Sequence, residues 1–368
     1  MIAVPIRRHW RWVVVASATA LLVSLPRLVA ARPFTAPSIA PEELAARILS
    51  SGPVAYQGYV DTRGTLELPD VPRTGRATTL LGEPSALRAW VASPTSWRVD
   101  ELSTVGEHDT YHIGTTLWVW DSQERRVRRS DDTAPTRVVR SNDLLPPELA
   151  RRLLAGAAAS ELEPLGALRV AGRAAAGIRV RPSSSETTIG TIDIWADPAT
   201  GLAVRVAITG RGDPHPSVVS RFLQLDEHAP AAEQVRFTPP RGVQVDGGNG
   251  TLDLLQIAGR FGNVALPAEL AGSPRTTPGA VSDGNYGSGF TLVNVAAVRQ
   301  RDAGALLGAE VPSTVRSWGG EARVLVTPLM SVLVVTTRRA TYAMGGAVTV
   351  DVLDRYANAL TQLDRGGS

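Results

Sequence analysis

Two histidines four residues apart have the most obvious potential for chemistry in this chain. They lie in the run His108-Asp109-Thr110-Tyr111-His112, and this spacing can direct two imidazoles towards one metal ion. The motif ends there, because no HExxH context accompanies it and the nearby acids are typical of loops. We therefore predict no metal site and expect both histidines to be exposed to solvent.

Adjacent acidic residues suggest paired carboxylates for glycoside hydrolysis or a cation site. The pairs are Glu42-Glu43, Asp131-Asp132 and Asp226-Glu227. Neighbours in sequence do not face each other across a cleft, as the two carboxylates of a glycosidase must. We interpret the pairs as solvated residues on loops and helix ends.

A glycine-rich run from Gly284 to Gly289 superficially resembles a phosphate loop. A strand, rather than a helix N-terminus, is predicted after it, so it implies no dinucleotide site. Ser288 lacks the Gly-x-Ser-x-Gly elbow of a hydrolase, and a catalytic triad has no other support in the sequence. We predict a turn here, and no catalytic residues, enzymatic activity or cofactor for the chain.

Composition excludes several further kinds of chemistry. The chain has no cysteine, which excludes disulfides, thiol nucleophiles, thiolate metal sites and a lipid-modified cysteine. It also has no lysine, so all 38 basic residues are arginine, and Schiff-base chemistry and a P-loop lysine are excluded.

Tryptophans are the most promising candidates for ligand contacts. Trp90, Trp118, Trp120 and Trp195 all lie on predicted strands, and Trp118 and Trp120 point to the same face. A curved sheet can present such rings to an apolar ligand. The alternative is that they fill the core beneath a covering helix, and the sequence does not decide between the two faces.

The stretch from Ile192 to Ile208 predicts a β-hairpin that carries one of these tryptophans. Apolar residues alternate with others on both sides of a turn, Asp197 to Gly201, whose Asp, Pro and Gly suit a bulged hairpin. Trp195 is opposite in phase to Ile192 and Ile194, so only one of these two sets can face a cavity.

Short strands with turn residues between them predict an antiparallel, meandering sheet around this hairpin. Amphipathic patterns predict helices at Pro41–Ser50 and within Leu144–Ala158, and a final helix capped by Asp351. The other predicted strands are Val54–Asp61, Ala86–Ala92, Trp97–Leu102, Tyr111–Ile113, Thr116–Asp121, Arg126–Arg129, Leu168–Ala171, Ala175–Arg181, Val218–Leu225, Gln234–Phe237, Gly289–Val295, Ala322–Val326, Val332–Thr336, Ala340–Met344 and Ala347–Val350.

Residues 1–31 predict an export signal. Three arginines precede an apolar core from Val13 to Leu25, which is short for a membrane span, and Val29-Ala30-Ala31 suits cleavage after Ala31. Arg27 leaves an uncleaved anchor as the alternative. Cleavage changes the formal net charge from +3 to −1, so the high isoelectric point does not indicate nucleic-acid binding. We expect an extracytoplasmic location.

Several of these segments together resemble the LolA/LolB/RseB group of bacterial extracytoplasmic proteins. The matching segments are Thr115–Asp121, the helix start at Pro146–Ala150, the hairpin Ile192–Val206 and the ending Phe237–Pro240, in the group's order and spacing. The resemblance covers roughly 42–245. It implies an α+β fold in which helices close a curved antiparallel half-barrel (LolA-like), with lipids or acyl chains bound on its concave side.

RseB-like members of the group add a smaller C-terminal domain and regulate a membrane anti-sigma factor. A Gly-rich shift at 242–250 predicts a linker over 246–265 and a small C-terminal α+β domain over 266–363, which matches that arrangement. The short segments Tyr286–Phe290 and Gly345–Val348 resemble what actinobacterial relatives carry, and the arginine- and alanine-rich composition suggests a GC-rich bacterium. Two functions therefore remain open: a carrier of a lipid, an acyl chain or a lipidated segment such as that of a lipoprotein, and a regulator that senses lipid or envelope stress and binds an anti-sigma factor.

Overall fold

The structure, a computed structural model, describes residues 14–17, 19, 38–66, 75–103, 106–132, 139–247, 264–276, 283–298 and 311–366. The chain divides into two compact units, residues 1–36 and 37–368. Val14–Ser17 are helical in the first unit, whereas the rest of the predicted signal core and the cleavage position after Ala31 lie outside the described residues, apart from Thr19. None of the helices in the described ranges combines the length and the apolar character needed to cross a membrane.

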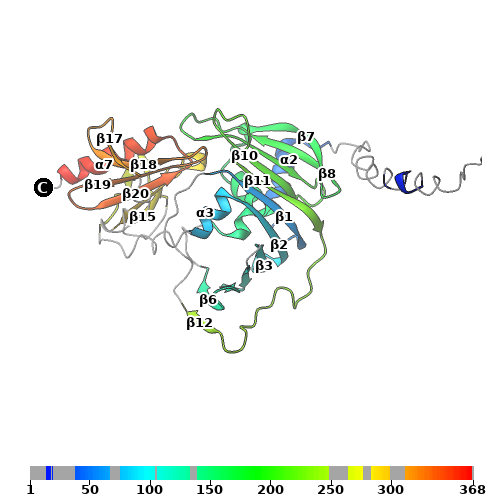
Figure 1. Cartoon of the computed structure of the whole chain (residues 1–368). Coiled ribbons are helices and arrows are strands. Elements are labelled where there is room, and N and C mark those ends of the chain that lie inside the picture. The colour runs from blue at the N-terminus through cyan, green and yellow to red at the C-terminus, as the bar shows by residue number, and fades with distance from the viewer. Residues whose placement is uncertain are drawn as a thin grey trace, which may run out of the picture. The chain divides into compact units, whose positions relative to one another are not determined.

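A large, curved, open sheet of twelve strands dominates the second unit (Figure 1). Its spatial order is β12-β6-β5-β4-β3-β2-β1-β11-β10-β9-β8-β7. The strands are β1 (Tyr56–Gly64), β2 (Pro84–Ser93), β3 (Ser96–Leu102), β4 (Glu107–Ile113), β5 (Thr116–Asp121), β6 (Arg126–Asp131), β7 (Leu162–Val170), β8 (Arg173–Val180), β9 (Ile189–Ala196), β10 (Ala203–Gly210), β11 (Val218–Asp226) and β12 (Gln244–Gly247).

Two meanders joined side by side build this sheet, as the short strands predicted. Strands β1 to β6 follow one another in order, strands β7 to β11 do the same, and β1 pairs with β11. All neighbours are antiparallel except β12, which runs parallel to β6. A bulge between Tyr59 and Val60 interrupts the register of β1 with β11 and adds local twist to the right-handed twist of the strands.

The predicted hairpin is confirmed as β9 and β10. Ile192 pairs with Ile208, and Ile194 pairs with Val206. In the turn, Asp197 Oδ1 accepts a hydrogen bond from the backbone nitrogen of Ala199 (2.8 Å), and Gly201 adopts φ +71°. A Cβ atom at Gly201 would also collide with the carbonyl oxygen of Arg47, so both the backbone angle and the space require glycine.

Two helices, α2 (Pro41–Ser50) and α4 (Pro146–Leu154), cover one face of the sheet, and both begin at proline, as predicted. Helix α2 contacts β7 and β8, and α4 contacts β10 and β11. A 3₁₀ helix, η2 (Ser141–Leu144), precedes α4, and η3 (Ala159–Glu161) follows it. The chain is therefore mostly β with few helices.

A second sheet of six strands has the order β15-β16-β20-β19-β18-β17 and packs against α7 (Val350–Gly366). Its strands are β15 (Asp283–Tyr286), β16 (Val293–Val298), β17 (Ser313–Val315), β18 (Glu321–Val326), β19 (Ser331–Thr336) and β20 (Thr341–Gly346). The two-residue strands β13 (Glu269–Leu270) and β14 (Ser273–Pro274) pair separately. The turn predicted over Gly284–Gly289 is confined to the end of that run, because its first three residues belong to β15 and η4 (Gly289–Thr291) begins at its last residue. The division into domains at 246–265 remains a prediction, and most of that linker lies outside the described residues.

Four local predictions are wrong. Gln234–Phe237 belongs to an irregular segment between β11 and β12, because no neighbouring strand offers it a ladder (Figure 1). Ala347–Val350 is not a strand, although Val348 forms an isolated bridge with Thr187, which lies just before β9. Asp351 lies inside α7 rather than at its cap, and the strand predicted at Gly289 begins only at Val293, after η4.

Candidate functional site

The two faces of the large sheet differ in what covers them. We name the face against which α2 and α4 pack the inner face, and the opposite one the outer face. Ile192 and Ile194 lie on the inner face, both fully buried, and Trp195 lies on the outer face. The hairpin thus directs its aliphatic set towards the helices and its tryptophan away from them.

Aliphatic side chains fill the inner face where the helices meet it. Leu44 and Ile48 of α2 and Leu154 of α4 belong to one buried cluster with strand residues that include Ile178 and Ile194. Burial of each such side chain contributes about 1.5–3 kcal/mol. In this conformation the chain's own side chains occupy the place where the resemblance predicts an acyl chain.

The histidine pair lies further along the inner face, on β4, and the prediction of exposed histidines is wrong. His108 and His112 are only 9% and 7% exposed. The His112 ring stacks on Trp97 (centroids 5.3 Å apart, planes 10° apart), and its Nε2 lies 3.5 Å from a carboxylate oxygen of Asp132. His108 Nδ1 lies 3.5 Å from Asp121. Each histidine thus has its own carboxylate neighbour, and the two do not converge on one point.

Acidic residues surround a cavity of about 550 Å³ at one end of β2 to β5. Glu83, Glu101, Glu107 and Asp121 line it beside His108. Helix α3 (Gly75–Gly82), which the sequence did not indicate, contributes Thr79. Within the described ranges no three His, Asp or Glu side chains are grouped so that they could coordinate a metal ion. The carboxylates give the cavity a negative potential, but they do not form a metal-binding site.

All four predicted tryptophans lie on the outer face. Trp90 is on β2, Trp118 and Trp120 are on β5, and Trp195 is on β9. Their alternation along the strands places them opposite the helix-covered side chains. Their role as ligand contacts remains a prediction, but they would contact a ligand on the outer face and not beneath the helices.

Arginines and aromatic rings alternate across the outer face from β6 to β2. Cross-strand partners place Arg129 beside Trp118, Trp118 beside Tyr111, and Tyr111 beside Arg98. The Arg98 guanidinium lies 4.9 Å from the Tyr111 centroid and 4.8 Å from the Trp90 centroid. Arg88 and Arg129 cover Trp90 and Trp118 at 4.9 and 5.5 Å. Each contact of this kind contributes about 0.5–2 kcal/mol.

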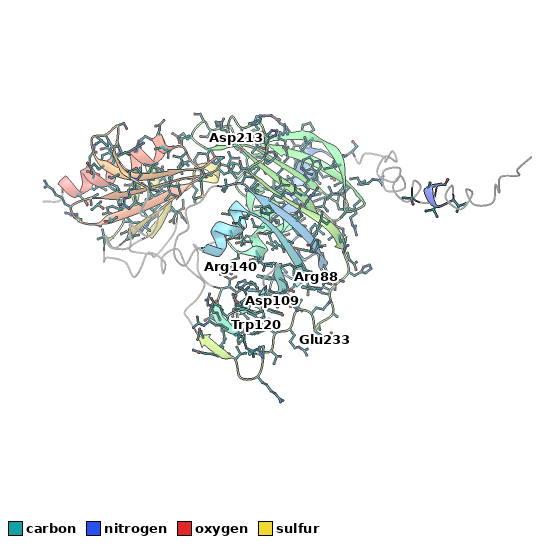
Figure 2. All side chains as sticks on the ribbon, viewed as in Figure 1. Arg88, Asp109, Trp120, Arg140, Asp213 and Glu233 are labelled. Atoms are coloured by element: carbon teal, nitrogen blue, oxygen red, sulfur yellow. The ribbon has the colours of Figure 1, made fainter. Side chains whose placement is uncertain are left out.

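Two buried carboxylates neutralise the central arginine of this row. Arg98 binds Asp100 through two hydrogen bonds (2.6 and 2.7 Å) and reaches Asp109 on the next strand at 3.1 Å. Asp100 and Asp109 are directly opposed in the β3–β4 register. Burial, and next the charge of Asp100, raise the pKa of Asp109 to about 7, although Arg98 acts in the opposite direction. Figure 2 labels Arg88, Asp109 and Trp120, which together with Asp100 form the adjacent row of cross-strand partners on the same face.

Phe237 from the irregular segment packs on the same row. Its ring centroid lies 4.7 Å from that of Tyr111 and 5.5 Å from that of Trp118. The residue mistaken for the end of a strand thus holds the connection between β11 and β12 against the outer face.

Trp195 lies apart from this row, towards β9 and β10. Its indole nitrogen donates a hydrogen bond to the carbonyl oxygen of Gly166 (2.9 Å), which fixes the ring. The Arg205 guanidinium covers the ring at 5.2 Å.

Two of the acidic pairs depart from the expected solvated state. The Asp132 carboxylate binds Arg140 (2.9 Å) besides lying near His112, and Glu227 binds Arg173 (2.8 Å). Burial is the largest influence on the Glu227 carboxyl and raises its pKa. Glu42 and Glu43, in contrast, lie at a helix end as predicted, in the first turn of α2, where their negative charges interact favourably with the positive end of the helix dipole.

Sequence reasoning missed the arginines as partners of the tryptophans. The sequence does contain evidence for one of these contacts, because Arg88 and Trp90 are two residues apart on one strand and must share a face. The contact of Arg129 with Trp118 depends on the register between strands, which the pattern does not reveal.

No known family profile and no curated protein sequence matches this chain. Solved structures do match its fold. One is the complex structure of Pseudomonas aeruginosa MucA/MucB, with a TM-score of 0.50 and 17% identity over 87% of this chain and 97% of that chain. Another is MucB in complex with MucA(peri), with a TM-score of 0.49 and 17% identity over 87% and 98%. A LolA superfamily protein from Nitrosomonas europaea has a TM-score of 0.25 and 10% identity over 54% and 99%. The chain shares the fold of the matched MucB structure.

Proposed function

We propose that this chain is an extracytoplasmic, non-enzymatic binding protein that regulates a membrane anti-sigma factor by contacting its exported part. The observation that carries this proposal is the extent of the similarity to MucB. It spans 87% of this chain and 97% of the matched chain, so it extends well beyond the large sheet. MucB is seen in complex with MucA.

The filled inner face favours the regulator over the carrier. Ile178, Ile192 and Ile194 belong to one buried cluster with side chains of α2 and α4, so an acyl chain must first displace one of these helices. A regulator needs no such cavity. The side chains with catalytic potential have structural partners: His112 stacks on Trp97, and the buried carboxylates bind arginines.

A co-elution experiment tests the proposal. The full chain is mixed with the purified exported half of an anti-sigma factor from the same genome and analysed by size-exclusion chromatography with light scattering. We expect a complex whose mass is the sum of one copy of each. An unrelated acidic protein of similar size serves as the control for charge-driven association. Elution as two separate species at concentrations of about 10 μM, typical of weak complexes, would remove the regulatory proposal.

The second candidate function is lipid binding beneath the two helices. Its support is the cover itself, because α2 and α4 are 10 and 9 residues long and lie over a wholly aliphatic surface. Displacement of such short helices would expose that surface to an acyl chain. Native mass spectrometry of the purified chain tests this: we expect a lipid-sized mass increment that organic extraction removes, and an unmodified mass in both samples would contradict lipid binding.

Export is a separate part of the proposal and has its own measurement. N-terminal sequencing of the chain from membrane and soluble extracytoplasmic fractions should give a start at Arg32 if the signal is cleaved after Ala31. An intact N-terminus in the membrane fraction would indicate an anchor, and an intact N-terminus in the cytoplasm would contradict export.

A further inference from the structure

One arginine on the outer face, Arg205, has a positive neighbour, and in the described part of the chain no ion pair joins it to an acid. Arg205 on β10 is directly opposite Arg221 on β11, and like charges in that position of an antiparallel ladder destabilise the pair. Arg221 has Asp61 as a partner at 3.1 Å. The Arg205 Nε atom, in contrast, is buried and has no hydrogen-bond partner among the described residues.

The neighbouring carboxylates are already engaged. Asp193, the acid on the adjacent strand β9, binds Arg179 through two hydrogen bonds of 2.6 and 2.7 Å. Asp61 lies between Arg221 and Arg63, at 3.1 and 3.3 Å. These arginines outnumber the two acids, so the surface around Arg205 has an excess of positive charge. Burial, and next the charge of Arg221, lower the pKa of the Arg205 guanidinium, which is a cost that a bound anion would remove.

The site is held rigid and is partly open. Trp195 forms the floor beneath Arg205 and is itself fixed by its hydrogen bond to Gly166. A stacked guanidinium presents its N–H edge in a defined direction, which suits bidentate binding of a carboxylate. Leu223, two residues after Arg221 on β11, is 45% exposed and offers an apolar contact near the charge.

We propose that the surface formed by Trp195, Arg205, Arg221 and Leu223 is a docking site for an acidic polypeptide segment, with one carboxylate of that segment bound between the two arginines. A single carboxylate would offset the repulsion between the opposed guanidinium groups of Arg205 and Arg221, whereas a continuous anionic surface such as a bilayer would also approach Asp61 and Asp193. The curvature of the sheet likewise favours a chain that can follow it. The inference deepens the proposed function, on which it rests only in requiring a polypeptide partner.

The test uses the full chain and a fluorescein-labelled peptide of alternating glutamate and alanine, followed by fluorescence anisotropy at low and high salt. We expect Arg205→Gln to weaken binding of the peptide about tenfold, because it removes one bidentate, charge-assisted interaction between a guanidinium and a carboxylate. Arg205→Lys keeps the positive charge but cannot bind a carboxylate in a bidentate way, and it should weaken binding of the peptide about threefold. Arg241→Gln removes the same charge from an exposed position on the β11–β12 connection and serves as the matched control, with a change of less than about twofold.

The stability of the variant separates docking from folding. Because Arg205 opposes Arg221, we expect Arg205→Gln to melt at the same temperature as the parent protein or above it. Equal losses of peptide affinity in Arg205→Gln and Arg241→Gln, or equal binding of a lysine–alanine peptide by the parent, would overturn the proposal. Arg205-dependent binding of phosphatidylglycerol-containing vesicles without peptide binding would also overturn it, in favour of a membrane surface.

The same variant distinguishes this inference from the proposed function. If the parent and Arg205→Gln form the complex with the anti-sigma segment equally well and the acidic peptide does not bind, the docking site fails and the proposed function stands. If the parent does not bind the anti-sigma segment but binds the acidic peptide through Arg205, the docking site is supported and the proposal that the partner is an anti-sigma factor is contradicted.

Discussion

The inner and outer faces of the large sheet reach burial by different means. On the inner face, side chains such as Ile194 and Leu44 exclude water through aliphatic contact alone. On the outer face, Trp90 is almost as buried, but arginines cover it and carboxylates in turn neutralise one of those arginines. The inner face should therefore be sensitive to volume and polarity, and the outer face to charge and pH.

The largest expected effect comes from a charge on the inner face. Ile194→Asp would bury a carboxylate among aliphatic side chains, and we expect it to cost more than about 5 kcal/mol and to prevent folding. The control, Thr191→Asp, makes a similar change on the outer face of the same strand and should cost about 1 kcal/mol or less. Urea denaturation monitored by tryptophan fluorescence measures both, and similar losses would show that the faces do not differ as described.

Removal of the central arginine of the outer face should cost nearly as much. Arg98→Met keeps a long apolar stem over Trp90 but leaves Asp100 and Asp109 without their cation, and we expect a loss of about 3–5 kcal/mol at pH 8. Arg129→Met, in which an exposed guanidinium over Trp118 is lost, should cost less than about 1 kcal/mol. A small loss in Arg98→Met would contradict a buried, charge-neutralised cluster.

The pH dependence of stability should be specific to the outer face. The pKa of Asp109 is raised to about 7 in the folded chain, above its unfolded value of about 3.9, so the folded state binds more protons between these values. The contribution of Asp109 to the free energy of unfolding is fully present below its unfolded pKa and is lost as the pH rises through its folded pKa of about 7. We expect a loss of about 1–3 kcal/mol between pH 5 and pH 8, within the usual range for a partly compensated buried carboxylate.

Asp109→Asn should flatten this dependence, because an amide does not titrate. The urea midpoint of the variant and of the parent protein, measured at pH 5 and pH 8, gives the comparison. Thr110→Val, a substitution on the opposite face of the same strand, should leave the slope unchanged. A slope that persists in Asp109→Asn would assign the pH dependence to other groups.

The smallest expected effect concerns the irregular segment on the outer face. Phe237→Ala removes the ring that packs on Tyr111 and Trp118, and we expect a loss of about 1 kcal/mol together with faster proteolysis between residues 228 and 243. Phe237→Leu should retain most of the protection. Limited proteolysis with mass mapping measures the rate, and unchanged cleavage in Phe237→Ala would show that the ring does not hold the segment.

Local features of the sequence predicted a large part of the fold. Helix α2 and strand β5 begin and end where predicted, because proline at a helix start and alternation along a strand are written in adjacent residues. The turn at Gly201 was equally local. The same reasoning failed for Gln234–Phe237, whose alternation imitates a strand although the pattern contains no information about a pairing partner.

The candidate site was less predictable than the fold because it depends on contacts between strands. Alternation placed Trp195 opposite Ile194 but did not show which set lies under the helices. His108 and His112 resembled surface residues, since a strand with polar residues on both faces has no apolar side to mark its burial. The opposition of Arg205 and Arg221 follows from the β10–β11 register, which depends on a turn and a bulge elsewhere.

Strand β12 has a consequence for how copies of the protein behave together. It is four residues long, largely exposed and polar, and it pairs along β6, the outermost strand of the first meander. An uncovered β6 would offer its backbone to the β6 of another copy, which is the usual route to polymerisation through strand edges. Strand β12 thus covers this edge, and deletion of Gln244–Gly247 should promote association of copies through β6.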